Sequence, residues 1–302
     1  MSSTVTELAE LIRRRLYAGN NRTRYNFLGA GVTATDTTLT FSDDTDGIEV
    51  GGSLAMGTEL LYVRSVNKAA KQATVVRGFS GSTAAAALDG ALVEVAPRFW
   101  LGDVVDTMLE EIHSWPTGLF QVVTLDVPLV PRTRAFDLGG ETRDVLYILE
   151  AVVDEDNVGS YRIGDSSWGE RAAVLIRDPN RSTFVSGQGI QLRVPAAHAG
   201  TLRVTYAVGF DQADIEANDD LTEDAGIPEG WYDIIRYGVM WRMISHREVG
   251  RTDPQSAGES RRDEAVPPGY LSQTANSLLK LRDRRIADEE SRLRAAWPYK
   301  SP

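Results

Sequence analysis

Two runs of β-forming residues joined by a short polar turn are the feature that most constrains how this chain folds. The runs are 59–66 (Glu-Leu-Leu-Tyr-Val-Arg-Ser-Val) and 73–77 (Ala-Thr-Val-Val-Arg), and the turn is 67–72. Gly78 and Gly81 lie in the loop that follows, and glycine tolerates backbone angles that residues with a Cβ avoid. The pattern predicts a β-hairpin that ends in a shaped loop.

Length and composition limit the class of protein. A chain of 302 residues exceeds the usual size of one core, so two or three modules are expected, and 42% hydrophobic with 25% charged residues is typical of globular proteins. The absence of cysteine excludes disulfides, thiolate metal sites and cysteine nucleophiles. No apolar run approaches the ~20 residues of a bilayer span. The first residues lack the pattern of a signal peptide, so we do not expect secretion.

The net charge of −11 bears on DNA. A protein that reads DNA sequence usually carries a basic face, so this charge argues against that class. It is compatible with a pore through which DNA passes, because like charge suppresses phosphate contacts. Solubility is the plainer explanation.

The chain begins with a predicted helix. Thr4 and Glu7 have the spacing of a capping box, and Gly19 ends the run. Apolar residues recur at helical spacing at Val5, Leu8, Ile12 and Leu16. Basic residues 13–15 occupy the last turn, where interaction with the helix dipole and solvent is favoured over contact with an acidic neighbour or DNA.

Two β regions follow, separated by a helix at 100–114. In the first, at about 25–97, we predict strands at 37–41, 59–66, 73–77 and 91–95. In the second, at about 120–210, we predict strands at 145–153, 171–177, 190–194 and 202–208. Turn clusters between these strands favour an antiparallel sandwich or barrel. Residues 211–226 form an acidic linker.

The C-terminal part is predicted to be helical. One helix runs from Pro228 to about Arg247, and a polar loop follows at 250–268. A final helix at 270–296 has a thin apolar stripe, typical of a helix that lies along another helix of its own chain or of a partner.

Together these elements predict an α+β fold, with a helical bundle frame and two antiparallel β-module insertions. The expected divisions are an N-terminal helix (1–24), a small β module (25–98), a middle helix (99–117), a larger antiparallel β domain (118–212) and a C-terminal helical region (213–302).

Several chemical motifs fail on context. Residues 29–34 fit the dinucleotide pattern G-x-G-x-x-A, but a poor helix sequence follows them. Asp44 and Asp46 suggest a calcium loop, but serines stand at Ser42 and Ser53 where the EF-hand pattern needs acids. The three histidines stand apart, no two carboxylates are singled out as a catalytic pair, and residues 164–169 lack the spacing of a nucleophile elbow. We therefore expect no catalytic, cofactor or metal site, and no enzyme.

The hairpin and its loop resemble a module of tailed-phage virion proteins, GTE-x-hydrophobic…V-x-RG-aromatic-x-GST-A, matched here by residues 57–61 and 75–84. The order of the helices resembles the head-to-tail connector (adaptor) of long-tailed actinobacteriophages, although two large β insertions depart from that nearly all-helical family. Adaptors of this family form a ring of twelve copies below the portal, and their C-terminal segment inserts into it.

The resemblance implies two sets of contact residues. The expected portal interface is Leu279, Arg282, Arg285, Ile286, Leu293 and Trp297. The expected inter-subunit or loop contacts are Arg77, Phe79, Trp231 and Trp241. For the two tryptophans, burial in the helical bundle is the alternative to an oligomer interface, where large aromatic side chains are enriched.

The expected function is a virion neck protein between capsid and tail. Its partners would be identical copies in a 12-mer ring, the portal protein, a downstream stopper or tail neck protein, and double-stranded DNA that passes through the lumen without sequence-specific binding. No membrane partner is expected. A tail-tip, baseplate or fibre protein for host attachment is the alternative, and a carbohydrate-acting enzyme with paired acids is a third.

Overall fold

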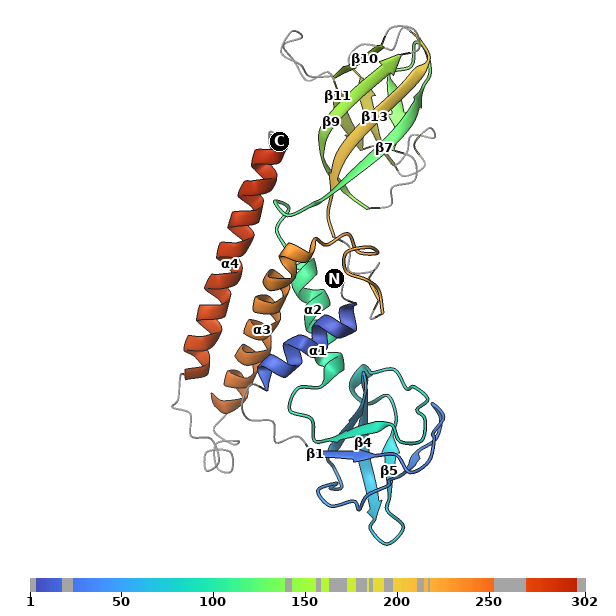
Figure 1. The fold of residues 1–302 in the computed structure, drawn as a ribbon, viewed down its shortest axis with the longest axis vertical. Coiled ribbons are helices and arrows are strands. Elements are labelled where there is room, and N and C mark those ends of the chain that lie inside the picture. Colours follow the sequence, from blue (N-terminus) through green and yellow to red (C-terminus); the bar gives the residue numbers. More distant parts are fainter. Residues whose placement is uncertain are drawn as a thin grey trace. The chain divides into compact units, whose positions relative to one another are not determined.

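The computed structural model groups the chain into two compact units (Figure 1). It describes residues 4–17, 24–138, 143–155, 159–162, 173–177, 184, 187–192, 198–210, 215–216, 218–252 and 270–297. The first unit comprises Met1–Glu111, Glu216–Asp224 and Pro228–Lys280. The second comprises Ile112–Ile215, Ala225–Ile227 and Leu281–Pro302.

The first unit contains a small β module with one antiparallel sheet. Its strands are β1 (Arg24–Phe27), β2 (Thr38–Thr40), β3 (Ser53–Met56), β4 (Glu59–Asn67), β5 (Gln72–Val76) and β6 (Leu92–Val95). They lie in the order β1-β6-β3-β4-β5-β2. The strands predicted at 37–41, 59–66, 73–77 and 91–95 are confirmed to within two residues at each end. The sequence does not predict β1 and β3, which are too short to show an alternating pattern.

This sheet curls until its two edge strands meet. Beyond the end of β1, Gly29 N donates to Thr40 O (2.8 Å), and Ser42 N donates to Phe27 O (2.9 Å). An antiparallel bridge between Leu28 and Phe41 lies beside these bonds. The curled sheet encloses a core of buried apolar residues: Leu28, Val32, Leu39, Phe41, Ile48, Leu54, Met56, Leu61, Val63, Ala73, Val75, Val93 and Val95. The β module therefore has a core of its own.

Helix α1 (Val5–Leu16) begins with the predicted capping box. Thr4 Oγ1 accepts from Glu7 N, and the Glu7 carboxylate accepts from Thr4 N. The helix packs against α3 (Tyr232–Thr252). Arg13, predicted to lie in solvent with its neighbours, is instead mostly buried and binds Glu94 of β6 at 2.6 Å. Helix α1 is thus tied to the β module as well as to a helix.

The remaining helices begin close to the predicted positions, but α3 continues to Thr252, beyond the predicted end near Arg247. They are α2 (Leu101–His113), the short 3-10 helix η4 (Glu229–Trp231), α3, and α4 (Tyr270–Ala296). The buried residues of α2 lie on one face and include Val104, Met108 and Ile112. In α3, Ile234, Ile235 and Val239 are fully buried.

The β part of the second unit consists of two antiparallel sheets over one core. One sheet has the order β10-β9-β13-β7, and the other has the order β11-β12-β8. The strands are β7 (Gln121–Leu129), β8 (Ala135–Asp137), β9 (Val145–Glu155), β10 (Gly159–Arg162), β11 (Ala173–Arg177), β12 (Gln188–Leu192) and β13 (Gly200–Val208). Phe136 and Ile190 from the smaller sheet share the core with Val153, Leu202 and Val204 from the larger one. The predicted antiparallel pairing of this region is confirmed.

The predicted helical bundle frame is wrong. The described residues form thirteen strands and four α-helices, and a curled six-stranded sheet and two further sheets dominate the fold (Figure 1). The apolar stripes of the helices were assigned to packing among the helices themselves. In the structure the two β regions each enclose their own core, so they are not insertions that depend on a bundle.

Some predicted features lie outside the described residues. These are Gly19 at the predicted end of the first helix, the segment 164–169, the start of the strand predicted at 171–177, the end of the strand predicted at 190–194, part of the acidic linker (211–214 and 217), and the part of the predicted loop at 253–268. Residues 250–252 of that loop belong to α3.

Candidate functional site

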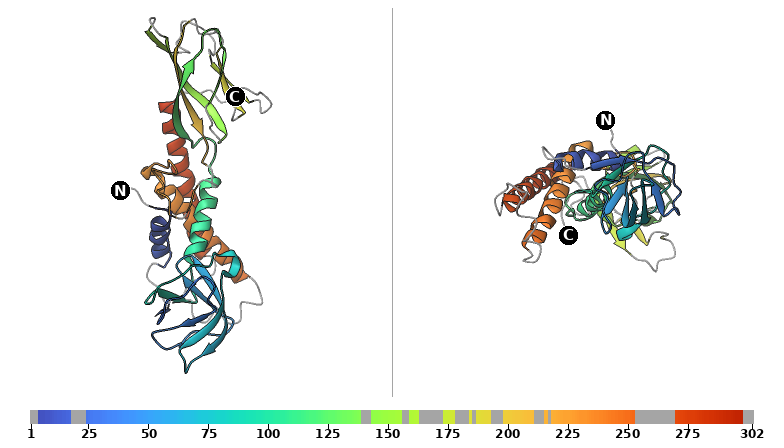
Figure 2. Two further views of the ribbon diagram at one scale, coloured as in Figure 1. Left: turned by 90° about the vertical axis from the view of Figure 1, so that its right-hand side faces the viewer. Right: turned by 90° about the horizontal axis from the view of Figure 1, so that it is seen from below.

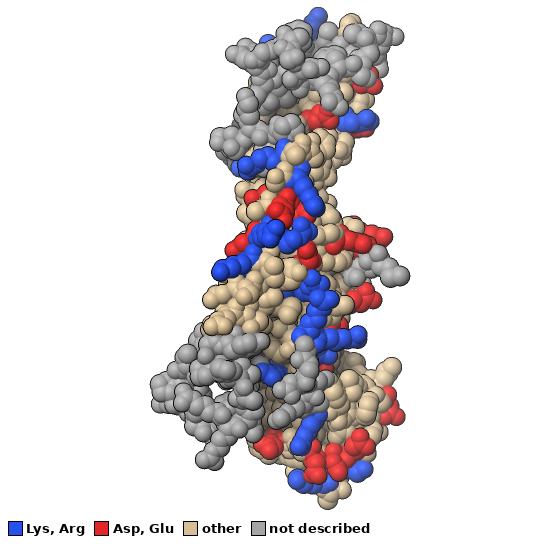
Figure 3. All heavy atoms as spheres, turned by 60° about the vertical axis from the view of Figure 1, so that its left-hand side comes forward, with Lys and Arg blue, Asp and Glu red and all other residues tan. Residues whose placement is uncertain are grey.

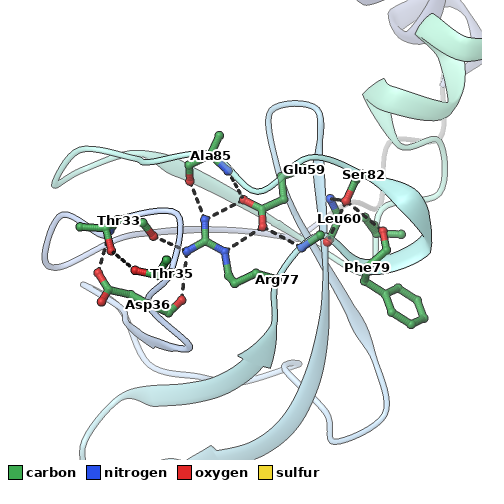
Figure 4. Close-up of polar contacts among 10 residues, drawn as sticks. Thr33, Thr35, Asp36, Glu59, Leu60, Arg77, Phe79, Ser82 and Ala85 are labelled. Atoms are coloured by element: carbon green, nitrogen blue, oxygen red, sulfur yellow. Dashed lines mark hydrogen bonds and ion pairs between the residues drawn. The ribbon is translucent and has the colours of Figure 1, made fainter.

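The hairpin motif of residues 57–61 and 75–84 is centred on a buried ion pair in the β module (Figure 4). A two-residue turn, Gly57–Thr58, joins β3 to β4 and makes Glu59 the first residue of β4. Arg77 follows the last residue of β5. The Glu59 side chain is fully buried, and that of Arg77 is 7% exposed. Arg77 Nε lies 2.7 Å from Glu59 Oε1, and Nη2 lies 2.8 Å from Oε2, so the pair is bidentate.

Every N–H of the Arg77 guanidinium has an acceptor. Besides the two bonds to Glu59, Nη1 donates to the carbonyls of Thr33 and Asp36, and Nη2 donates to the carbonyl of Ala85. Figure 4 shows these bonds converging from three separate segments. Arg77 therefore joins the 33–36 loop and the 78–87 segment to the start of β4.

The Glu59 carboxylate is equally well partnered. In addition to Arg77, Oε1 accepts from Gly78 N and Oε2 accepts from Ala85 N, each at 3.1 Å. Burial favours the protonated carboxyl, but the hydrogen bonds from Arg77, Ala85 and Gly78 outweigh it and lower the pKa of Glu59. The hydrogen bond to Glu59 favours the charged form of Arg77 and raises its pKa. Both groups remain charged inside the module.

The glycines and serine of the motif shape the loop beyond Arg77. Gly78 has a φ of 59°, and a Cβ there would meet the Ser82 carbonyl. Ser82 Oγ accepts from Leu60 N at 3.0 Å and lies 2.9 Å from Phe79 O, to which it can donate. The Phe79 ring packs on Tyr62, with centroids 5.2 Å apart, and remains 40% exposed. The motif therefore holds this loop in a fixed conformation, with the aromatic side chain of Phe79 facing outward.

The other predicted contact residues lie on helices. Trp231 in η4 is buried, at 5% exposed, and Trp241 in α3 is half-buried, with the Arg242 guanidinium 5.2 Å from its ring centroid. The structure brings Arg77 and Phe79 together in one loop and places both tryptophans in the η4–α3 segment. Whether these residues contact another subunit stays a prediction.

The predicted portal residues lie along α4, except Trp297, which directly follows it, and several of them contact their own chain. Ile286 is buried, and Arg282 Nη2 donates to Ser114 Oγ at 3.1 Å. Arg285 pairs with the buried Glu289 at 3.0 Å. The remaining predicted residues, Leu279, Leu293 and Trp297, are half-buried. The stripe predicted to meet a portal thus packs at least partly within this chain.

Sequence reasoning missed Glu59 as the partner of Arg77. The signal was present, since a glutamate at the start of an apolar strand and an arginine at the end of its hairpin partner are both expected to be buried charges that need pairing. It also missed the Glu111–Arg242 ion pair (3.0 Å), which links α2 to α3 in the first unit. No local sequence pattern joins residues so far apart.

The rejected dinucleotide and calcium motifs lie in loops of the β module. The segment 29–34 follows β1 without a helix after it, and a Cβ on Gly29 would approach the Phe41 backbone at 3.1 Å. Asp44 Oδ1 accepts from Asp46 N as part of the turn before β3. Within the described ranges, no group of three His, Asp or Glu side chains is arranged to hold a metal ion.

The surface carries charges of both signs. On the face drawn in Figure 3, Lys and Arg side chains lie among Asp and Glu side chains. None of the helices in the described part of the chain has the length and apolar character needed to cross a bilayer. No protein-family model matches the chain, and no curated protein matches it either.

Proposed function

We propose that this chain is a structural protein of a tailed-phage virion, and that identical copies form a ring that joins the portal of the capsid to the tail. The proposal depends on one observation about residues 57–61 and 75–84, which resemble a module of tailed-phage virion proteins: the charged residues of this motif are buried and paired within their own module. Its charged residues, Glu59 and Arg77, form hydrogen bonds with each other and with backbone groups of their own module. Such a motif supports a rigid scaffold rather than a reacting centre, as an assembly protein requires.

The proposed partners follow from the ring. One side would bind the portal protein and the other a stopper or tail neck protein, while double-stranded DNA passes through the lumen without sequence-specific binding. The net charge of −11 supports the last point, because repulsion between like charges suppresses contacts with phosphates. We expect an acidic or neutral lumen.

Copy number tests the proposal most directly. The full-length protein would be purified and examined by native mass spectrometry and negative-stain electron microscopy, alone and with the portal. Twelve copies in a closed ring are expected. Three or six copies would favour the tail-tip, baseplate or fibre alternative, and a monomer that hydrolyses carbohydrate would favour an enzyme.

We propose α4 as the portal-binding element. Truncation after Pro268 would also remove Ile286, which is buried in its own chain, so exposed positions give a cleaner test. Leu281 is 45% exposed and Arg284 is exposed. The L281E/R284E variant should keep its ring and lose capture by the portal, while N276E, at another exposed position of α4, should keep both. Retained capture by L281E/R284E would argue against α4.

A further inference from the structure

Helix α1 has an outward face that is both apolar and basic. Leu11 is 44% exposed, and Arg14 and Arg15 beside it are exposed, while Val5, Ala9 and Ile12 on the opposite face are fully buried. Residues three and four apart are neighbours on a helix surface, so Leu11, Arg14 and Arg15 form one patch. Among the described residues, neither arginine has an ion-pair partner. We term this patch the basic face of α1.

Helix α2 has an outward face of the opposite sign. Asp103, Asp106 and Glu110 are exposed and are spaced three and four residues apart, so they lie on one side of the helix. Like charges at this spacing repel each other and destabilise a helix. Although Asp106 is exposed, partial shielding of its carboxyl from water, and then the charges of Asp103 and Glu110, raise its pKa. We term these three residues the acidic face of α2.

We infer that the basic face of α1 binds the acidic face of α2 on a neighbouring copy of this chain. Both faces belong to the first unit and lie on separate helices, with α1 toward the left and α2 toward the right in the left view of Figure 2. Two different patches make a head-to-tail interface, which forms a ring when the rotation between copies closes. The inference rests on the proposed function, since it names the contact between subunits of the proposed ring.

Charge complementarity identifies the acidic face of α2 as the surface that binds the basic face of α1. Opposite potentials steer two surfaces together and penalise wrong pairings. The loop before β3 is also acidic, but Asp46 is already paired with Lys68 of its own chain at 3.6 Å, and Asp44 caps a turn. In the acidic face of α2, Asp106 and Glu110 repel each other, and an arginine pair from a neighbouring copy relieves this repulsion. Leu11 adds apolar area that is removed from water on contact.

Charge reversal tests the interface in the full chain. R14E/R15E and D106K/E110K should each assemble roughly a hundredfold more weakly than the unchanged protein, because like charges then face each other. Mixing the two variants should restore assembly, since each presents the face that the other needs. The chain that combines all four changes should assemble by itself. Mass photometry over a concentration series measures each case, and circular dichroism checks folding.

The matched control is D43K/E49K, which makes the same change of charge at two exposed positions before β3. It should assemble normally. If it fails to assemble while D106K/E110K assembles, or if mixing the two reversed variants restores nothing, the inference is overturned. Rings formed equally well by all variants would overturn the interface and leave the ring intact. A monomeric unchanged protein would overturn both.

Discussion

At the scale of single residues, we expect substitution of Arg77 to cause a large loss of stability in the β module. Its guanidinium satisfies the fully buried Glu59 carboxylate and three carbonyls. Arg77→Met should lower the free energy of unfolding of the β module by about 3–5 kcal/mol, because it leaves a buried carboxylate without its counter-charge. Urea denaturation, together with hydrogen exchange of the β4 and β5 amides, measures the loss.

Lys68 supplies a control for this experiment. It forms an ion pair with Asp46 in the same module, but both side chains are about three-quarters exposed. Lys68→Met should cost less than about 1 kcal/mol, as surface pairs usually do. Equal losses for the two variants would mean that the Arg77 network contributes no more than a surface pair.

The same pair predicts acid sensitivity. Glu59 has a pKa below its ordinary value of 4.5, so the unfolded chain binds its proton more readily than the folded chain. The stabilisation is therefore present above pH 4.5 and is lost as the pH falls through the lower, folded pKa. Unfolding free energies measured from pH 7 to acid should fall less steeply in E59Q/R77M than in the unchanged protein. Parallel pH profiles would contradict this account.

At the scale of elements, Gly238 is required where α3 crosses α2. A Cβ at this position would collide with the carboxylate of Glu111, which is fully buried and paired with Arg242. Gly238→Ala should therefore destabilise the first unit by about 1–3 kcal/mol, although alanine normally favours a helix. Thermal unfolding measures the change. At Gly230, where a Cβ meets nothing within 4 Å, the same substitution should be neutral or slightly stabilising, and a similar result at Gly238 would show that Glu111 can move aside.

Elements were predictable from sequence to the extent that their signal is local. The capping box of Thr4 and the 270–296 helix depend on neighbouring residues, and both are confirmed. Strands β1 and β3 escaped because four residues carry too little alternation, and they form by pairing with β6. The prediction of a helical bundle was wrong for a related reason. An amphipathic stripe indicates that one face of a helix is buried, but it does not identify the element that packs against that face. Arg13 is covered partly by Glu94 of a strand.

The partners of the motif were the least predictable part of the site. Arg77 was identified as a contact residue, but its acceptors come from 33–36, from 59 and from 85, which only the curled sheet brings together. Ser80 adopts a left-handed backbone conformation because of the loop geometry, and a serine in the sequence does not predict this conformation.

At the scale of the whole molecule, each β region keeps its core within one continuous stretch of chain. The core of the β module comes from residues between Leu28 and Val95. That of the larger β region comes from residues between Val123 and Val208. Pairing of Gln121 with Val208 also brings the two ends of the larger region together.

Two fragments should therefore fold alone, 24–98 and 119–210. Each contains its whole described core, and neither leaves a described strand of its sheets behind. Each should unfold cooperatively with dispersed amide resonances. Leu202→Ala should lower the stability of the second fragment by about 2–5 kcal/mol, because Leu202 is fully buried in its core. Nuclear magnetic resonance and thermal denaturation measure both properties. A fragment without dispersed resonances would mean that the rest of the chain supplies stability its own core lacks, and the two β regions would then be parts of larger folding units.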